Sequence, residues 1–163
     1  MSALTLGWIY QPFTRSVNTG SSPESKKLEE RFKEIVLHFR RRVERERAFS
    51  ELARVIDVGR QPDWDRYGAS EFDNRLSQLA CRFLNALPSV IPAPDVGLDP
   101  DGEISFSWIL SRDRQVHVSL SPDGLLSYAG LFGATSTVHG KEPFDDTVPV
   151  PIIETVRRLG IQL

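Results

Sequence analysis

The spacing of apolar residues changes along this chain, and that change constrains the fold more than any other feature of the sequence. From Leu28 to Val43 the apolar side chains recur every three or four residues, which is the period of an amphipathic α-helix. From Glu103 to Ser121 they alternate with polar residues, which is typical of a β-strand with one buried face. The sequence therefore predicts helices packed against an antiparallel sheet.

Two helices are expected in the first half of the chain. The first spans residues 23–58, with Pro23 at the first helical position, where its missing N–H costs nothing. Its apolar pattern changes phase at residues 45–48, which predicts a bend or a break there. The second helix is expected to begin after Ser70 as its N-cap and to end at Pro88.

The second half predicts three strands at residues 103–110, 114–121 and 125–132, and a final helix that ends at Gly160. Residues 131–146 are expected to form a loop that holds the final helix on the sheet. The fold class is thus α+β: a three-stranded or slightly larger antiparallel meander packed against two to three helices, with a long N-terminal helix. The expected core residues are Leu76, Leu79, Phe83, Leu87, Ile104, Phe106, Trp108, Val116, Val118 and Leu120.

The length of 163 residues suits one globular domain with an attached helix. The expected parts are an N-terminal arm at 1–22, a long amphipathic helix at 23–58 and an α+β domain at 59–163. No apolar run approaches the roughly 20 residues of a membrane span, and no secretion signal is evident at the N-terminus. A single cysteine, Cys81, excludes an internal disulfide, so we expect a cytoplasmic protein.

The formal net charge of −2 conceals an uneven distribution. Residues 24–57 carry ten Lys and Arg against eight Asp and Glu, whereas residues 95–146 carry nine acids against three bases. Such asymmetry bears on binding partners rather than on the fold. An acidic strand half favours a basic protein partner.

The sequence holds no recognisable catalytic or metal-binding motif. His117 and His139 are the best candidates for a general base, but no G-x-S-x-G motif is present and no group that would orient either ring can be named. One cysteine and three scattered histidines give no zinc spacing, and the calcium-loop pattern that begins at Asp99 places Leu110 where a carboxylate is needed. We therefore expect no enzyme, no metal and no cofactor.

Two groups of residues are candidates for binding. Four large aromatic residues lie in the expected arm and in the turn between the two helices, where they would contact a protein partner or, for the arm, pack on the chain itself: Trp8, Tyr10, Trp64 and Tyr67. Five arginines in the long helix either form a solvated, ion-paired face or contact nucleic-acid phosphates: Arg40, Arg41, Arg42, Arg45 and Arg47.

Several motifs resemble a family of small bacterial proteins whose activity is uncharacterised. The segment Asp63-Trp64-Asp65-Arg66-Tyr67-Gly68-Ala69 is similar to that family's W-D-x-Y-G-A turn, with Arg66 where glycine is commoner. Asp101-Gly102-Glu103-Ile104 with Trp108 is similar to its D-G-E-I-x-x-x-W strand. The resemblance covers about residues 60–160 and implies a bacterial cytosolic protein from accessory gene sets, without implying any catalytic residue.

Together these features predict a non-enzymatic protein-binding module, namely the antitoxin, immunity or adaptor component of a bacterial accessory or defence gene pair. Its expected partner is the product of a neighbouring gene. The alternative is a nucleic-acid-associated protein that uses the arginine-rich helix. The sequence leaves the oligomeric state open.

Overall fold

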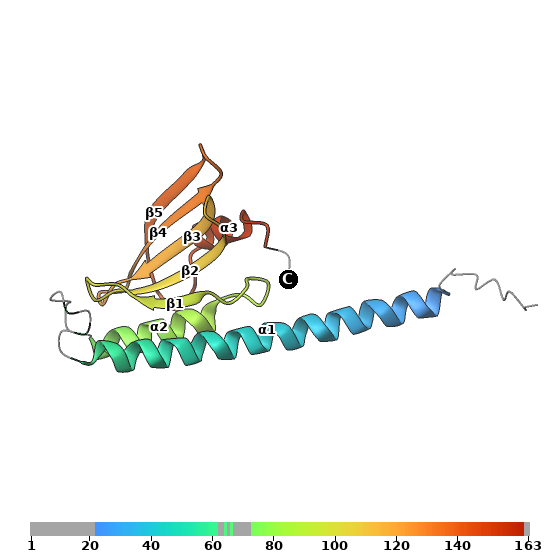
Figure 1. Cartoon of the computed structure of the whole chain (residues 1–163), viewed down its shortest axis with the longest axis horizontal. Coiled ribbons are helices and arrows are strands. Elements are labelled where there is room, and N and C mark those ends of the chain that lie inside the picture. Colours follow the sequence, from blue (N-terminus) through green and yellow to red (C-terminus); the bar gives the residue numbers. More distant parts are fainter. Residues whose placement is uncertain (1–21, 62–63, 65, 67–72, 162–163) are drawn as a thin grey trace, which may run out of the picture. The chain divides into compact units, whose positions relative to one another are not determined.

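The computed structural model describes residues 22–61, 64, 66 and 73–161. Its contacts divide the chain into two units, Met1–Glu34 and Ile35–Leu163. The described part of the first unit is the beginning of helix α1 (Pro23–Gly59). The second unit contains the rest of α1, five strands and two further helices, which Figure 1 labels in chain order.

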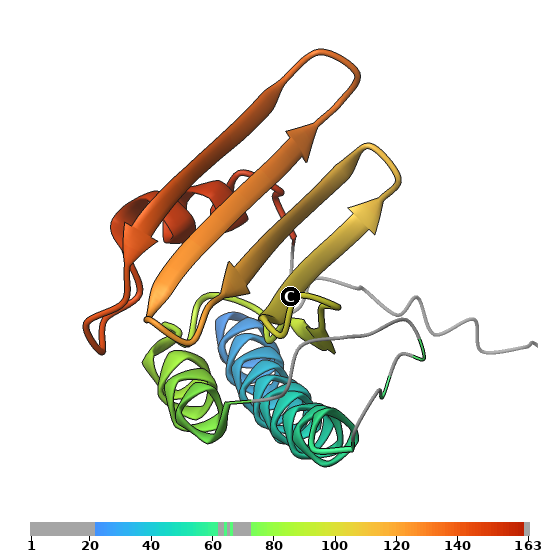
Figure 2. The ribbon, with the colours of Figure 1, turned by 90° about the vertical axis from the view of Figure 1, so that its left-hand side faces the viewer.

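The five strands form one antiparallel sheet in the order β1-β2-β3-β4-β5, so each strand pairs with its neighbour in the sequence. Figure 2 shows this meander with helix α3 behind it. The predicted α+β meander is therefore confirmed, in its slightly larger form. The strands are β1 (Asp95–Leu98), β2 (Ile104–Ser111), β3 (Arg114–Leu120), β4 (Leu125–Phe132) and β5 (Thr137–Pro143).

The structure corrects two predictions for the helices. Helix α1 runs without interruption from Pro23 to Gly59, so the phase change at residues 45–48 does not mark a break in the helix. Helix α2 (Asn74–Ala86) has Asp73 as its N-cap instead of Ser70, and the Asp73 side chain accepts a hydrogen bond from the Arg75 N–H at 2.7 Å. Ser70 itself lies outside the described residues.

The core lies on one face of the sheet, against α2, the C-terminal half of α1 and helix α3 (Val150–Arg157). Phe83 of α2 is fully buried and stacks on Phe106 of β2 with ring centroids 4.4 Å apart. All ten predicted core residues are buried. Alternation in the strands and helical spacing in α2 were sufficient to find them, because each of these elements buries a single face.

The prediction of a loop at residues 131–146 is wrong for residues 137–143, which form strand β5. β5 pairs with β4 in a register that sets Tyr128 opposite Gly140. A Cβ atom at Gly140 would lie 2.5 Å from the Tyr128 hydroxyl oxygen, so the absent side chain makes room for the tyrosine. Strand β1 lies within residues 88–100, a segment that contains four prolines.

Candidate functional site

Helix α1 carries two apolar faces that point in opposite directions. Ala48 and Leu52 are buried in the core of the second unit. Phe39 and Val43 precede them by nine residues each, which is about two and a half turns of an α-helix. Their side chains therefore point away from the core, and both are exposed, Phe39 by 69% and Val43 by 48%.

These two residues belong to a longer row of exposed apolar side chains, here called the α1 stripe. Its six members recur at helical spacing along α1 and are between 43% and 71% exposed: Leu28, Phe32, Ile35, Val36, Phe39 and Val43. Water-exposed phenylalanine and isoleucine side chains in a continuous row are unfavourable unless something covers them. The α1 stripe is therefore the strongest candidate for a binding surface among the described residues.

Three polar contacts fix the C-terminal half of α1 to the domain while leaving the stripe free. The Arg45 guanidinium donates a hydrogen bond to the carbonyl oxygen of Leu87 at 2.8 Å, at the end of α2. Arg47 forms an ion pair with Asp95 of β1 at 2.8 Å. The Glu51 carboxylate accepts a hydrogen bond from the Val96 N–H at 3.1 Å. All three contacts involve the core-facing side or the edge of the helix.

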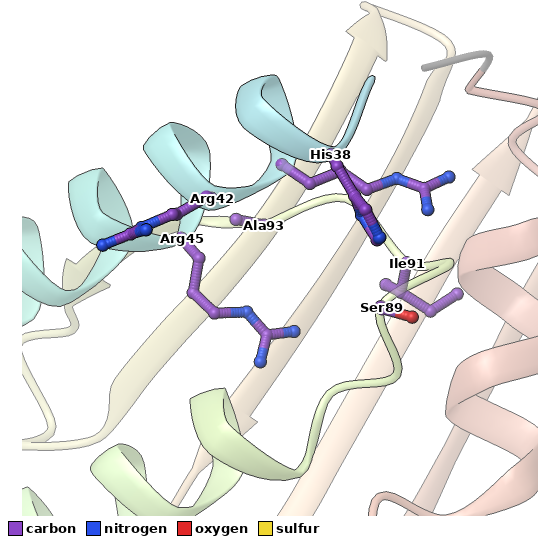
Figure 3. A pocket seen from close by; sticks show the side chains of 7 residues that line it. His38, Arg42, Arg45, Ser89, Ile91 and Ala93 are labelled. Carbon is purple, nitrogen blue, oxygen red and sulfur yellow. The ribbon is translucent and has the colours of Figure 1, made fainter. Parts of the chain in front are cut away.

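A basic hollow of about 240 Å³ lies between α1 and the segment that follows α2. Figure 3 shows His38 and Arg45 pointing from α1 toward Ser89 and Ile91, whereas Arg42 points away from Ser89. Arg42 is instead paired with Glu46 at 3.1 Å. No acidic residue is among the side chains that line the hollow: His38, Arg41, Arg42, Arg45, Ser89, Ile91 and Ala93.

Arg41 is the unusual member of this basic hollow. Its Nε is buried and has no hydrogen-bond partner among the described residues. A buried donor without an acceptor is costly, and a guanidinium is well shaped to meet a carboxylate or a phosphate. The hollow therefore has the charge and one free donor for an anionic group.

The five arginines predicted as a nucleic-acid surface do not form one surface. Arg41, Arg42 and Arg45 line the hollow, but Arg45 is also bound to Leu87. Arg47 is held by Asp95 and by Glu51, and Arg40 is exposed outside the hollow. The sequence could not separate these roles, because they depend on which acid or carbonyl lies across from each arginine.

Most of the predicted aromatic contacts fall outside the described part of the chain. Trp8, Tyr10 and Tyr67 are not among the described residues. Trp64 is half-buried, and its indole Nε1 is buried without a hydrogen-bond partner among the described residues. The aromatic residues that the structure does expose on a binding face are Phe32 and Phe39 of the α1 stripe.

The polar face of the sheet brings the histidine candidates into one row. Ser107, His117, Ala129 and His139 lie opposite one another on β2, β3, β4 and β5. The Ser107 hydroxyl is 2.8 Å from His117 Nδ1. Within the described ranges, no side chain forms a hydrogen bond with the other ring nitrogen of His117. The pair thus lacks the third group that orients the base in a catalytic triad.

Carboxylates gather at the end of the sheet where β1 turns into β2. Burial raises the pKa of the Glu103 carboxyl, and the nearby charges of Asp101, Asp99 and Asp123 raise it further. Asp99 also accepts hydrogen bonds from Ser105 at 3.1 Å and Ser119 at 3.2 Å. The Asp99 segment closes a turn, in which the Gly102 N–H donates a hydrogen bond to the Asp99 carbonyl oxygen at 2.9 Å.

Among residues 22–61, 64, 66 and 73–161, no group of three or more His, Cys, Asp or Glu side chains is arranged to hold a metal ion. The helices in that same part of the chain include none with the length and apolar character needed to cross a membrane. Compared with known proteins, the chain matches no family model, no curated protein and no solved structure. Its binding partner is therefore inferred from its own residues.

Proposed function

We propose that this chain is a non-enzymatic protein-binding module whose binding surface is the α1 stripe. The observation that carries the proposal is the exposure of six large apolar side chains that recur at helical spacing along α1. A helix that presents a continuous apolar row is suited to bind another helix or a groove, where each large side chain fills a pocket. Within the second unit, an ion pair and hydrogen bonds hold the C-terminal half of α1 to the domain.

The finer form of the proposal is an antitoxin, immunity or adaptor component of a bacterial gene pair, acting in the cytoplasm. It is supported by the division of charge between the two halves of the chain. The acidic sheet half, with the carboxylates around Glu103, would attract a basic partner, while the stripe supplies apolar contact area. This proposal makes the product of the adjacent gene the partner to test.

The double substitution Phe32→Glu with Phe39→Glu tests the surface. We expect it to weaken binding of the co-expressed adjacent gene product by at least about 100-fold, because two central aromatic contacts are lost and two charges are buried. Isothermal titration calorimetry would measure the change. The matched control, Lys26→Glu with Lys33→Glu, changes two exposed side chains of the same helix outside the stripe and should leave the affinity within about threefold. Absence of any complex, or equal binding by both variants, would refute the proposal.

A second candidate function is nucleic-acid association through the basic hollow. The observation that favours it is the buried, unpartnered Nε of Arg41 beside an acid-free lining. Phosphate oxygens would accept a hydrogen bond from this donor, next to the His38 side chain that also lines the hollow.

Replacing Arg41 with glutamine should weaken oligonucleotide binding and lower its salt dependence. One lost phosphate contact would reduce the slope of log K against log salt by about 1, as measured by fluorescence anisotropy over a salt series. Arg54→Gln, at an exposed position of the same helix outside the hollow, is the matched control and should not change the slope. If the unaltered protein binds no oligonucleotide at low salt, this second function is excluded.

A further inference from the structure

The α1 stripe has an internal symmetry that identifies a partner. Its six residues are arranged symmetrically about the midpoint between Ile35 and Val36. Moving outward from that midpoint, Phe32 is mirrored by Phe39 and Leu28 is mirrored by Val43. The order of the large side chains is therefore similar from either end of the row. Such a row is complementary to the same row of a second copy that lies antiparallel to it.

We propose that the α1 stripe binds the stripe of a second copy of this chain, giving an antiparallel helix pair with a two-fold axis at the Ile35–Val36 midpoint. This inference rests on the proposed function, because it uses the same binding surface, and it places a second copy on the stripe where the proposed function places the adjacent gene product. A two-fold interface needs one patch that is complementary to itself, and the mirrored stripe meets that requirement. In this arrangement Phe32 of each copy lies level with Phe39 of the other, and Leu28 lies level with Val43.

The extent of the overlap fits the exposed part of the helix. With this axis, Pro23 of the second copy lies level with Ala48, the first residue of α1 that is fully buried in the core. The paired segment therefore ends at the first fully buried residue of α1. In the second unit, the stripe residues Phe39 and Val43 point away from the core. Ala48 and Leu52 therefore keep their packing in the dimer.

The apolar area is sufficient for a stable contact. A large apolar side chain offers about 150 Å², so six side chains that are 43–71% exposed present roughly 500 Å² on each copy. Both copies together would cover roughly 1,000 Å² of apolar surface, which lies at the lower limit for a specific protein interface. The roughly 500 Å² on one copy is comparable to the largest apolar patch of a typical monomer, which is often a functional surface.

In an antiparallel pair, opposite charges would face each other on one flank of the stripe. On the other flank like charges would face each other, but one of them is already ion-paired. Glu29 and Arg40 lie about three turns apart on the same side of the stripe, so Glu29 of each copy would approach Arg40 of the other. On the opposite flank Arg31 would approach Arg42 of the second copy. The charge of Arg42 is already neutralised by Glu46 at 3.1 Å, so that approach is tolerated.

Sedimentation equilibrium of the full chain, between about 1 and 100 μM, tests whether the dimer exists. We expect a dimer that Phe32→Glu with Phe39→Glu converts to a monomer, whereas Lys26→Glu with Lys33→Glu remains dimeric. Circular dichroism of both variants checks that they are folded. A chain that is monomeric at the highest concentration would overturn the inference. If that monomer still forms a stripe-dependent complex with the adjacent gene product, the proposed function stands without the dimer.

Disulfide crosslinking tests the direction of the helices without charged substitutions. In a Cys81→Ala background, a protein carrying Phe32→Cys is mixed with one carrying Phe39→Cys and oxidised with copper phenanthroline. The mixture should crosslink, because the two positions are level across the antiparallel pair. Each protein alone should not, since identical positions would be about 10 Å apart along the axis, beyond the reach of a disulfide. Efficient crosslinking of each protein with itself would instead show a parallel pair and overturn the proposed arrangement.

Discussion

Phe83→Ala should lower the free energy of unfolding by about 3–5 kcal/mol. The ring of Phe83 is fully buried, stacks on Phe106 and meets the edge of Phe144 at a centroid distance of 5.7 Å. Removing it leaves a cavity at the contact between α2, β2 and the segment after β5, and the surrounding rings cannot collapse to fill it. Chemical denaturation followed by circular dichroism would measure the change.

Leu110→Ala is a suitable control for this prediction, because Leu110 is a large apolar residue of β2 that is 50% exposed. Its substitution should cost less than about 1 kcal/mol. A similar loss for both variants would contradict the assignment of Phe83 to the centre of the core. A small effect for Phe83→Ala alone would contradict it as well.

The core could be predicted from the sequence because α2 and the central strands each bury a single face. Phe106, Trp108, Val116 and Val118 alternate with small polar residues, and the structure buries all four. Local spacing and tertiary packing agree at these positions, so either one identifies the same residues. The same agreement holds along α2, where Leu76, Leu79 and Phe83 recur on the buried face.

Strand β5 was not predicted because it lies at the edge of the sheet and none of its side chains is fully buried. Its residues alternate only between exposed and half-buried positions, and it contains Gly140 and Pro143. Without an apolar face, alternation gives no signal. Strand β1 was not predicted for a different reason. A strand of four residues between prolines has the same sequence features as an extended connector.

The candidate site could be predicted only in part. The sequence shows the helical row from Leu28 to Val43, but spacing alone does not reveal whether another element covers that row. The phase change at residues 45–48, which predicted a bend or a break, is not a break in the helix. It is instead the point where α1 stops presenting its outward face and begins to pack its opposite face on the core, at Ala48. Only tertiary contacts distinguish a helix with two faces from two helices.

Leu52→Ala and Phe39→Ala should separate those two faces of α1 by their effects on stability. Leu52 is 1% exposed, and its truncation should lower the free energy of unfolding by about 2–5 kcal/mol at every protein concentration, because it leaves a cavity in the core. Phe39 is 69% exposed, and its truncation should change the stability of the isolated monomer by less than about 0.5 kcal/mol.

A second copy binds only the folded chain, so the cost of Phe39→Ala should increase with protein concentration, whereas that of Leu52→Ala should not. Urea titrations at two protein concentrations about 100-fold apart would show the difference. A large, concentration-independent loss for Phe39→Ala would place that ring in the monomer's own core and remove the basis for a binding stripe on α1.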